Sequence, residues 1–273
     1  LVKELGVEVL PLSFTMRNKT YRNWPDNREI DPKDFYRQLR EGEMATTSAV
    51  NVSDFTETIE PHLKEGRDVL VVAFSSGLSA TCHSAQIAAQ ELSEQYPERK
   101  VYVVDSLCAS LGQGLLVYLA AKEREQGKSI EEVRDWVEAH KLNLCHQFTV
   151  DDLHFLKRGG RVSAATAVVG SMLQIKPVLH VDNEGHLINM GKARGRHASL
   201  TALVDHMEQT AIDPGAQTVF ISHGDCLEEA ERVADDVRKR FGVKEIIINN
   251  VGPVIGAHSG PGTMALFFMG RER

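Results

Sequence analysis

The sequence lacks any hydrophobic run that approaches the ~20 apolar residues of a membrane-spanning helix. It also lacks an excess of positive charge: its net charge is −7 over 273 residues, so it does not offer the basic surface with which proteins bind nucleic acids. The four cysteines lie far apart and form no C-x-x-C pair, which argues against a zinc knuckle and a redox dithiol. A disulfide framework is not expected in a chain of this size, and we predict a reducing, cytoplasmic location.

Several catalytic motifs are absent as well. The eleven histidines include no H-E-x-x-H or similar ligand spacing, so no metal site is predicted. No Walker-type loop is present, which argues against a phosphotransferase. Gly112-x-Gly114 resembles a dinucleotide-binding fingerprint only superficially, because the sixth position is Val117 and both glycines lie within a helical pattern. We assign these glycines to helix packing and expect no cofactor.

Residues 1–150 alternate between strand and helix patterns. Val69 to Phe74 and Val101 to Val104 are continuous apolar segments, which are typical of strands buried on both faces. The alternation predicts an α/β fold with a mostly parallel sheet and flanking helices in an N-terminal lobe. A further strand is expected at 7–14, and helices are expected at 32–40, 53–65, 80–96 and 110–126 and from the capping box at 129–132.

Residues 151–273 show a less regular pattern, which predicts a mixed α/β C-terminal lobe and a lobe boundary near Thr149 to Asp152. Asp182 to Gly185 separates two strand patterns and predicts a hairpin turn. Strands are expected at 145–150, 176–181, 187–192, 218–222 and 245–250, and helices at 152–157, 163–172, 199–210 and 227–240.

The segment Gly252 to Gly262 holds four glycines and two prolines around His258. A stretch so rich in these residues predicts a shaped loop rather than a helix or strand. Taken alone, it is a tight connection whose histidine is satisfied by the backbone. Three other loops with matching chemistry make a ligand site the stronger interpretation.

Hydroxyl side chains gather in those three loops, at 46–51, 75–81 and 104–114. Ligands of open parallel sheets bind beyond the carboxyl ends of the strands, where the last two of these loops begin. At 75–81 the free N–H groups of a helix start join several hydroxyls, which suits an anion or a carboxylate. In the third loop we expect Asp105 and Ser106 to hold the backbone. Leu156 to Ser163 places three cations around a diglycine; from these residues alone a solvated helix end is favoured over a phosphate site or a partner contact.

Taken in order, these motifs resemble the DegV family of bacterial fatty-acid-binding proteins. The resemblance implies a two-lobed α/β protein that holds one long-chain fatty acid in a tunnel between and within the lobes. Some members are the carrier subunit of a fatty acid kinase and present the carboxylate to a separate ATP-using subunit, which makes acyl phosphate. The resemblance therefore implies a lipid carrier rather than an enzyme. Its motifs are 46–48, 75–79, 104–106, 156–163, 173–179 and 255–262.

Carried over to this sequence, the resemblance implies that the carboxylate contacts the hydroxyls of Thr47 and Ser76, with His258 nearby. The chain departs from the family pattern at four places, which bear on the shape of the tunnel. The usual first strand with its Asp-Ser-Thr turn is missing from this sequence, and the usual residues are replaced at Ala49-Val50, Ala80 and Cys82-His83. The implied supporting residues are Thr46, Ser75 and Ser79, and the candidates for docking the kinase subunit are Arg158 and Arg161.

A serine hydrolase that uses Ser76 with His258 is the alternative function. A serine on a strand-to-helix turn and a distant histidine are suitable components. However, the elbow motif G-x-S-x-G is absent from residues 74–78, and no acidic residue is clearly placed to orient His258.

Overall fold

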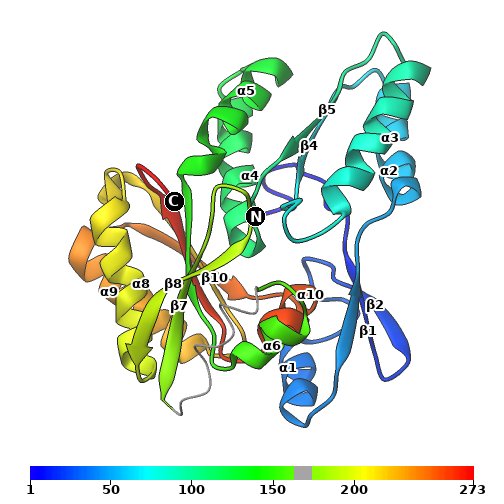
Figure 1. Cartoon of the computed structure of the whole chain (residues 1–273). Coiled ribbons are helices and arrows are strands. Elements are labelled where there is room, and N and C mark those ends of the chain that lie inside the picture. Colours follow the sequence, from blue (N-terminus) through cyan, green and yellow to red (C-terminus); the bar gives the residue numbers. More distant parts are fainter. Residues whose placement is uncertain (163–173) are drawn as a thin grey trace.

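The computed structural model describes residues 1–162 and 174–273. The helix predicted at 163–172 and the start of the apolar segment at 173–179 lie outside these residues. In the described parts the chain forms a mixed α/β fold with a six-stranded sheet, a three-stranded sheet and a two-stranded sheet (Figure 1). The predicted fold class is confirmed.

The three-stranded sheet is antiparallel and lies in the first fifth of the chain. It corrects two predictions: the strand expected at 7–14 begins only at Ser13, and the loop expected at Thr46 is a strand. Strand β3 pairs with β1 through the register Phe14–Thr47 and Thr15–Thr46, and threonine suits such pairing. The elements here are β1 (Ser13–Met16), β2 (Lys19–Arg22), α1 (Pro32–Arg40) and β3 (Ala45–Ser48).

The two-stranded sheet is the predicted parallel pair, with Val69 opposite Val101. The helices around it begin close to where the sequence predicts, although Asn51 rather than Ser53 caps α2. The capping box of Ser129 and Glu132 is fully formed at the start of α5. The elements are α2 (Val52–Lys64), β4 (Val69–Ala73), α3 (Thr81–Gln95), β5 (Val101–Asp105), α4 (Ser110–Glu125) and α5 (Ile130–His140).

The six-stranded sheet has the order β10-β9-β11-β6-β7-β8. The strand β11 runs antiparallel to both of its neighbours, β9 and β6, whereas β9 and β10 are parallel. The hairpin predicted around Asp182 to Gly185 joins β7 to β8. The strands are β6 (Leu144–Thr149), β7 (Ile175–Val181), β8 (Leu187–Arg194), β9 (Thr218–His223), β10 (Glu245–Asn250) and β11 (Met264–Met269).

Helices cover both faces of this sheet. Leu115 and Leu116 of α4 pack with Phe148 and Phe267 on one face, whereas α8 and α9 pack against Leu266 and its neighbours on the other (Figure 1). The first of these faces, between the sheet and α4, borders the site described below. The helices of this part are α6 (Leu153–Arg158), α8 (Arg196–Thr210), α9 (Leu227–Phe241) and α10 (Pro253–Ser259).

The helix α10 corrects the prediction of a shaped loop at 252–262. Pro253 occupies the first turn, where its missing N–H costs nothing, and Gly260 follows the last residue with φ 80°. Between them Gly256 packs against Tyr36, since a Cβ there would lie 2.5 Å from the Tyr36 hydroxyl oxygen. The glycines and prolines therefore bound and pack a short helix, which carries His258.

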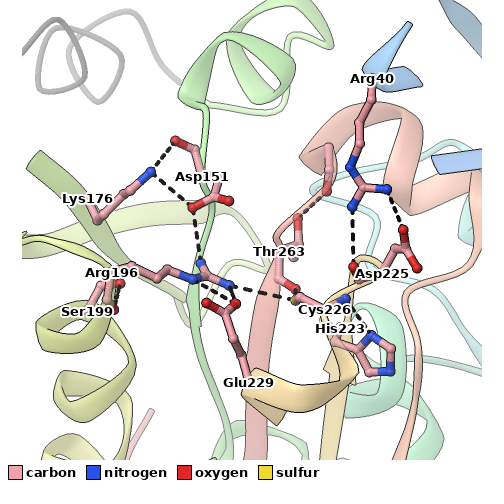
Figure 2. A network of polar contacts seen from close by, with 11 residues as sticks. Arg40, Asp151, Lys176, Arg196, Ser199, His223, Asp225, Cys226, Glu229 and Thr263 are labelled. Carbon is pink, nitrogen blue, oxygen red and sulfur yellow. Dashed lines mark hydrogen bonds and ion pairs between the residues drawn. The ribbon is translucent and has the colours of Figure 1, made fainter. Parts of the chain in front are cut away.

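Polar contacts tie the first part of the chain to the six-stranded sheet. The buried hydroxyl of Tyr36 donates to the carbonyl of Val251 at 2.7 Å, and Arg40 pairs with Asp225. Figure 2 shows this second contact beside a network in which Arg196 donates to Glu229 at 2.6 Å. Asp151 joins the network through Lys176 and Arg196. The division of the chain at residue 150 remains a prediction.

Candidate functional site

A cavity of about 370 Å³ lies between the six-stranded sheet, α4, α10 and the loop before α3. This volume is within the usual range for small-molecule sites. Polar side chains from separate elements line it, and much of the remaining wall is apolar. The apolar residues include Leu12, Phe74, Leu78, Phe148, Leu156, Val181, Leu187, Val251, Val254, Ile255, Ala265 and Phe267.

The structure brings Thr47 and His258 together in the wall of this cavity. The Thr47 Oγ1 atom, on β3, lies 2.7 Å from Nε2 of His258, on α10. Alternation along β3 places Thr46 on the opposite face, where it is exposed and pairs with Thr15. Thr46 therefore supports the strand and not the cavity wall.

The imidazole of His258 is held neutral. Burial, and then the nearby positive charge of Arg161, lower its pKa from 6.5 to about 4. Its Nδ1 atom has no hydrogen-bond partner among the described residues. If Nε2–H donates to Thr47, the threonine O–H is free to donate to a carboxylate in the cavity, and this is the tautomer we assign.

This pKa makes stability depend on pH. Between about pH 6.5 and pH 4 the unfolded chain binds a proton that folded His258 excludes, so stability falls as the pH decreases through this window. At pH 4.5 the loss attributable to His258 is up to about 3 kcal/mol. We expect urea unfolding of the native protein to weaken more from pH 7.5 to pH 4.5 than that of His258→Gln. Equal pH dependence in the two proteins would contradict this.

The serines of the second loop have different surroundings. Ser75 is fully buried, and its hydroxyl donates to the carbonyl of Gly185 at 2.9 Å, which fastens the loop to the β7–β8 hairpin. Ser76 is exposed and is not among the residues that line the cavity; its N–H donates to Asp105. Ser79 does line the cavity, and its Oγ lies 2.9 Å from Oγ1 of Thr81.

The third loop is held as the sequence predicts. Asp105 Oδ1 accepts from the N–H groups of Ser76 and Leu107, and Ser106 Oγ accepts from that of Cys108. These contacts confirm that Asp105 and Ser106 hold the backbone.

The structure separates the two arginines that were predicted as docking residues. Arg161 lines the cavity and donates to the carbonyl of Leu78 at 3.3 Å, so its charge acts on the site itself. Arg158 is exposed at the end of α6, with its guanidinium carbon 4.8 Å from the centre of the Phe155 ring. Of these two arginines, only Arg158 lies outside the cavity wall.

Sequence reasoning missed several polar residues of the cavity. Ser110, Gln113, Ser222 and Ser259 all line it. The hydroxyl oxygen of Ser259 is buried without a partner in the described parts of the chain. Ser110, Gln113 and Ser259 lie within the segments 104–114 and 252–262 that the sequence singles out, but nothing in the sequence marks them individually as lining residues. Ser222 lies in an apolar strand and has no local signal.

The contact that a serine hydrolase requires is not formed among the described residues. His258 bonds to Thr47 rather than to Ser76, and no carboxylate contacts its Nδ1 atom. A nucleophile needs its base within hydrogen-bond reach, and the base needs an orienting partner. The geometry thus disfavours the hydrolase alternative.

None of the helices in residues 1–162 and 174–273 has the length and apolar character needed to cross a membrane. In the same residues, Asp182, Glu184 and His186 are close enough to share a metal ion. However, Asp182 Oδ1 already accepts from two backbone N–H groups of its own turn. The formation of this turn is therefore enough to explain why the three side chains lie close together, and we assign no metal site to them.

Comparison with known families finds one model that spans the chain. The model described as "Uncharacterised protein, DegV family" matches residues 1–271. A DegV domain-containing protein of Clostridium perfringens is 48% identical over 270 residues, which cover 99% of this chain and 92% of that protein.

Two solved structures share the whole fold. A DegV family protein from Thermus thermophilus, described by its fatty acid binding, has a TM-score of 0.86 and 33% identity, with 98% of this chain and 93% of that one covered. A DegV lipid-binding protein from Thermotoga maritima has a TM-score of 0.85 and 30% identity, with 100% and 94% covered. Both likenesses extend over the segments that build the cavity.

Proposed function

Because this chain belongs to the DegV family, we propose that it binds one long-chain fatty acid in the cavity between the sheet, α4 and α10. One observation carries the proposal: a largely apolar cavity with a hydroxyl–imidazole pair, Thr47 and His258, in its wall. Amphiphiles need this combination of an apolar enclosure and a few polar groups. The solved relatives described by fatty acid or lipid binding support it.

The tail supplies most of the binding free energy. Burial is worth ~0.8 kcal/mol per methylene, so a C16 tail contributes about 12 kcal/mol gross. The head group then needs orientation more than affinity. Hydroxyls and a neutral imidazole provide this without the bidentate clamp that an arginine makes.

For the carboxylate we propose Thr47 and His258 as ligands. The role expected for Ser76 is better suited to Ser79, because the Ser79 side chain lines the cavity whereas Ser76 is exposed. Ser75 acts indirectly, through its hydrogen bond to Gly185. Arg161 adds a positive charge beside the head group.

The direct test is denaturing extraction of the purified protein followed by mass spectrometry of small lipids. We expect about one equivalent of a C14–C18 fatty acid, the size that tail burial of about 12 kcal/mol would retain. A protein that is empty, and remains empty after incubation with fatty acids, would overturn the proposal.

Thr47→Val should weaken fatty acid binding about tenfold, because it removes a donor to a charged carboxylate and keeps the side-chain shape. Titration with stearate measures the change. Thr46→Val is the matched control, since Thr46 lies on the other face of β3, and it should leave the affinity unchanged. Equal effects of the two substitutions would argue against Thr47 as a ligand.

We further propose that the bound fatty acid is presented to a separate fatty acid kinase subunit, as the family resemblance implies. The exposed Arg158 on α6 is our docking candidate, and α6 packs against α10, which carries His258. Arg158→Ala should retain the lipid and lose most phosphorylation by a fatty acid kinase catalytic subunit with ATP. Arg238→Ala, exposed on α9, is the control. Normal phosphorylation of Arg158→Ala would refute the docking role.

A further inference from the structure

Two hydroxyls meet in the wall of the cavity. Ser110 Oγ, at the start of α4, lies 3.0 Å from Ser222 Oγ, on β9. Both residues line the cavity, and Ser222 is fully buried. The two residues are 112 positions apart in the sequence, so the fold and not a local turn creates the pair.

The pair holds one hydrogen more than it uses. Each serine has one O–H, and a single hydrogen bond between the two oxygens consumes only one of them. In residues 1–162 and 174–273 neither oxygen contacts another hydrogen-bonding group. One O–H of this half-buried pair is therefore directed at no acceptor in the described parts of the protein. An apolar ligand that covers the pair would leave this donor without a partner, which is costly.

The polar neighbours do not satisfy this hydrogen. His146 uses both ring nitrogens, since Nε2 accepts from the N–H of Ala109 and Nδ1 contacts the carbonyl of Leu144. Gln113 Nε2 and Thr263 Oγ1 donate to the carbonyls of Val72 and Gly260, and among the described residues the oxygen of neither side chain is in hydrogen-bond contact with the serine pair. The acceptor can therefore be supplied by an occupant of the cavity.

The pair lies along the wall where the proposed tail would run. Ser222 is opposite Ala265 in the sheet register, and Ala265 is opposite Phe148. All three residues line the cavity, so the serine pair shares the sheet wall with apolar side chains. The proposed head-group ligands Thr47 and His258 come from other elements, β3 and α10.

We propose that the cavity selects fatty acids whose chain carries an oxygen, as a hydroxyl or a keto group, at the depth of Ser110 and Ser222. A plain methylene at this depth would cover the free O–H without replacing its lost hydration, whereas an oxygen would accept from it. The inference rests on the proposed fatty acid binding and adds the substrate class.

The test compares dissociation constants for stearate and a positional series of monohydroxystearates. At least one hydroxy isomer should bind the native protein about tenfold more tightly than stearate, the effect of one satisfied buried hydrogen bond. If stearate binds as tightly as every isomer, a water or nothing occupies the serine pair, and the inference is overturned. If the protein binds neither stearate nor any isomer, the proposed function itself fails.

The matched variant must remove both hydroxyls, because replacing one would release the O–H of the other. Ser110→Ala/Ser222→Ala should bind stearate at least as tightly as the native protein and lose the preference for the hydroxy isomer about tenfold. Ser110 has φ 53°, which glycine tolerates best, so Ser110→Gly/Ser222→Ala is the second variant if the first does not fold. An unchanged preference in a folded variant would overturn the inference.

Discussion

Replacing Ala265 by phenylalanine should weaken stearate binding at least a hundredfold. Ala265 is 6% exposed and lies on β11, where its small side chain lines the cavity between Ser222 and Phe148. A phenyl ring at this position would take the place of part of the tail. Displacing about four methylenes removes ~3 kcal/mol of burial, which is about a hundredfold in the dissociation constant. Equilibrium titration with stearate measures the loss.

A shorter ligand provides the control for this variant. Octanoate carries the same carboxylate and reaches less far along the wall, so its affinity should change by a much smaller factor. The thermal unfolding midpoint is measured beside it, because Ala265 also belongs to the buried apolar cluster around α4 and a ring that overpacked this cluster would lower stability. Equal losses for octanoate and stearate, or unchanged stearate binding, would show that the tail does not lie against Ala265.

Gly112→Ala should lower the free energy of unfolding by about 3 kcal/mol. A Cβ at Gly112 would lie 2.1 Å from Nε2 of His146, a ring that is 2% exposed and accepts from the N–H of Ala109. The ring must move, and the half-buried N–H of Ala109 then loses its acceptor. These costs exceed the ~1 kcal/mol that alanine gains over glycine in a helix. Urea unfolding at neutral pH measures the difference.

Gly114→Ala is a control in the same helix. The nearest atom to its added Cβ is the flexible end of Leu111, at 3.3 Å, so the change should be neutral or stabilise by up to ~1 kcal/mol. The sequence predicts helix packing for both glycines, whereas the structure assigns the close approach to Gly112. Comparable unfolding free energies for the two variants would contradict this assignment.

Elements with local signals were predictable. Asp31 before Pro32 and the box of Ser129 and Glu132 mark helix starts that the structure confirms, because a cap is a contact between near neighbours. The strand at Thr46 and Thr47 was not predictable, since its partner β1 lies some thirty residues earlier. The helix α10 was missed because Gly256 is explained only by Tyr36, which is distant in the sequence.

The site follows the same division. Chemistry and family resemblance identify Thr47 and His258 as candidates, and the structure places them 2.7 Å apart across 211 positions. The chemistry and the resemblance do not show that Ser79 rather than Ser76 lines the cavity, because that depends on how the loop at 75–81 is anchored to Gly185. The pair of Ser110 and Ser222 has no sequence signature at all, since it exists only where α4 meets β9.

The position of β11 has a consequence for how the protein is made. Although β11 comes last among the described strands, it lies between β9 and β6 near the middle of the sheet. During synthesis β9 and β6 therefore each keep one unpaired edge until Met264 to Met269 has left the ribosome. Pairings between distant segments form slowly, and open edges invite pairing with other chains. A nascent chain halted before β11 would thus expose two incomplete parts of the sheet, each with an open edge that can pair with another chain.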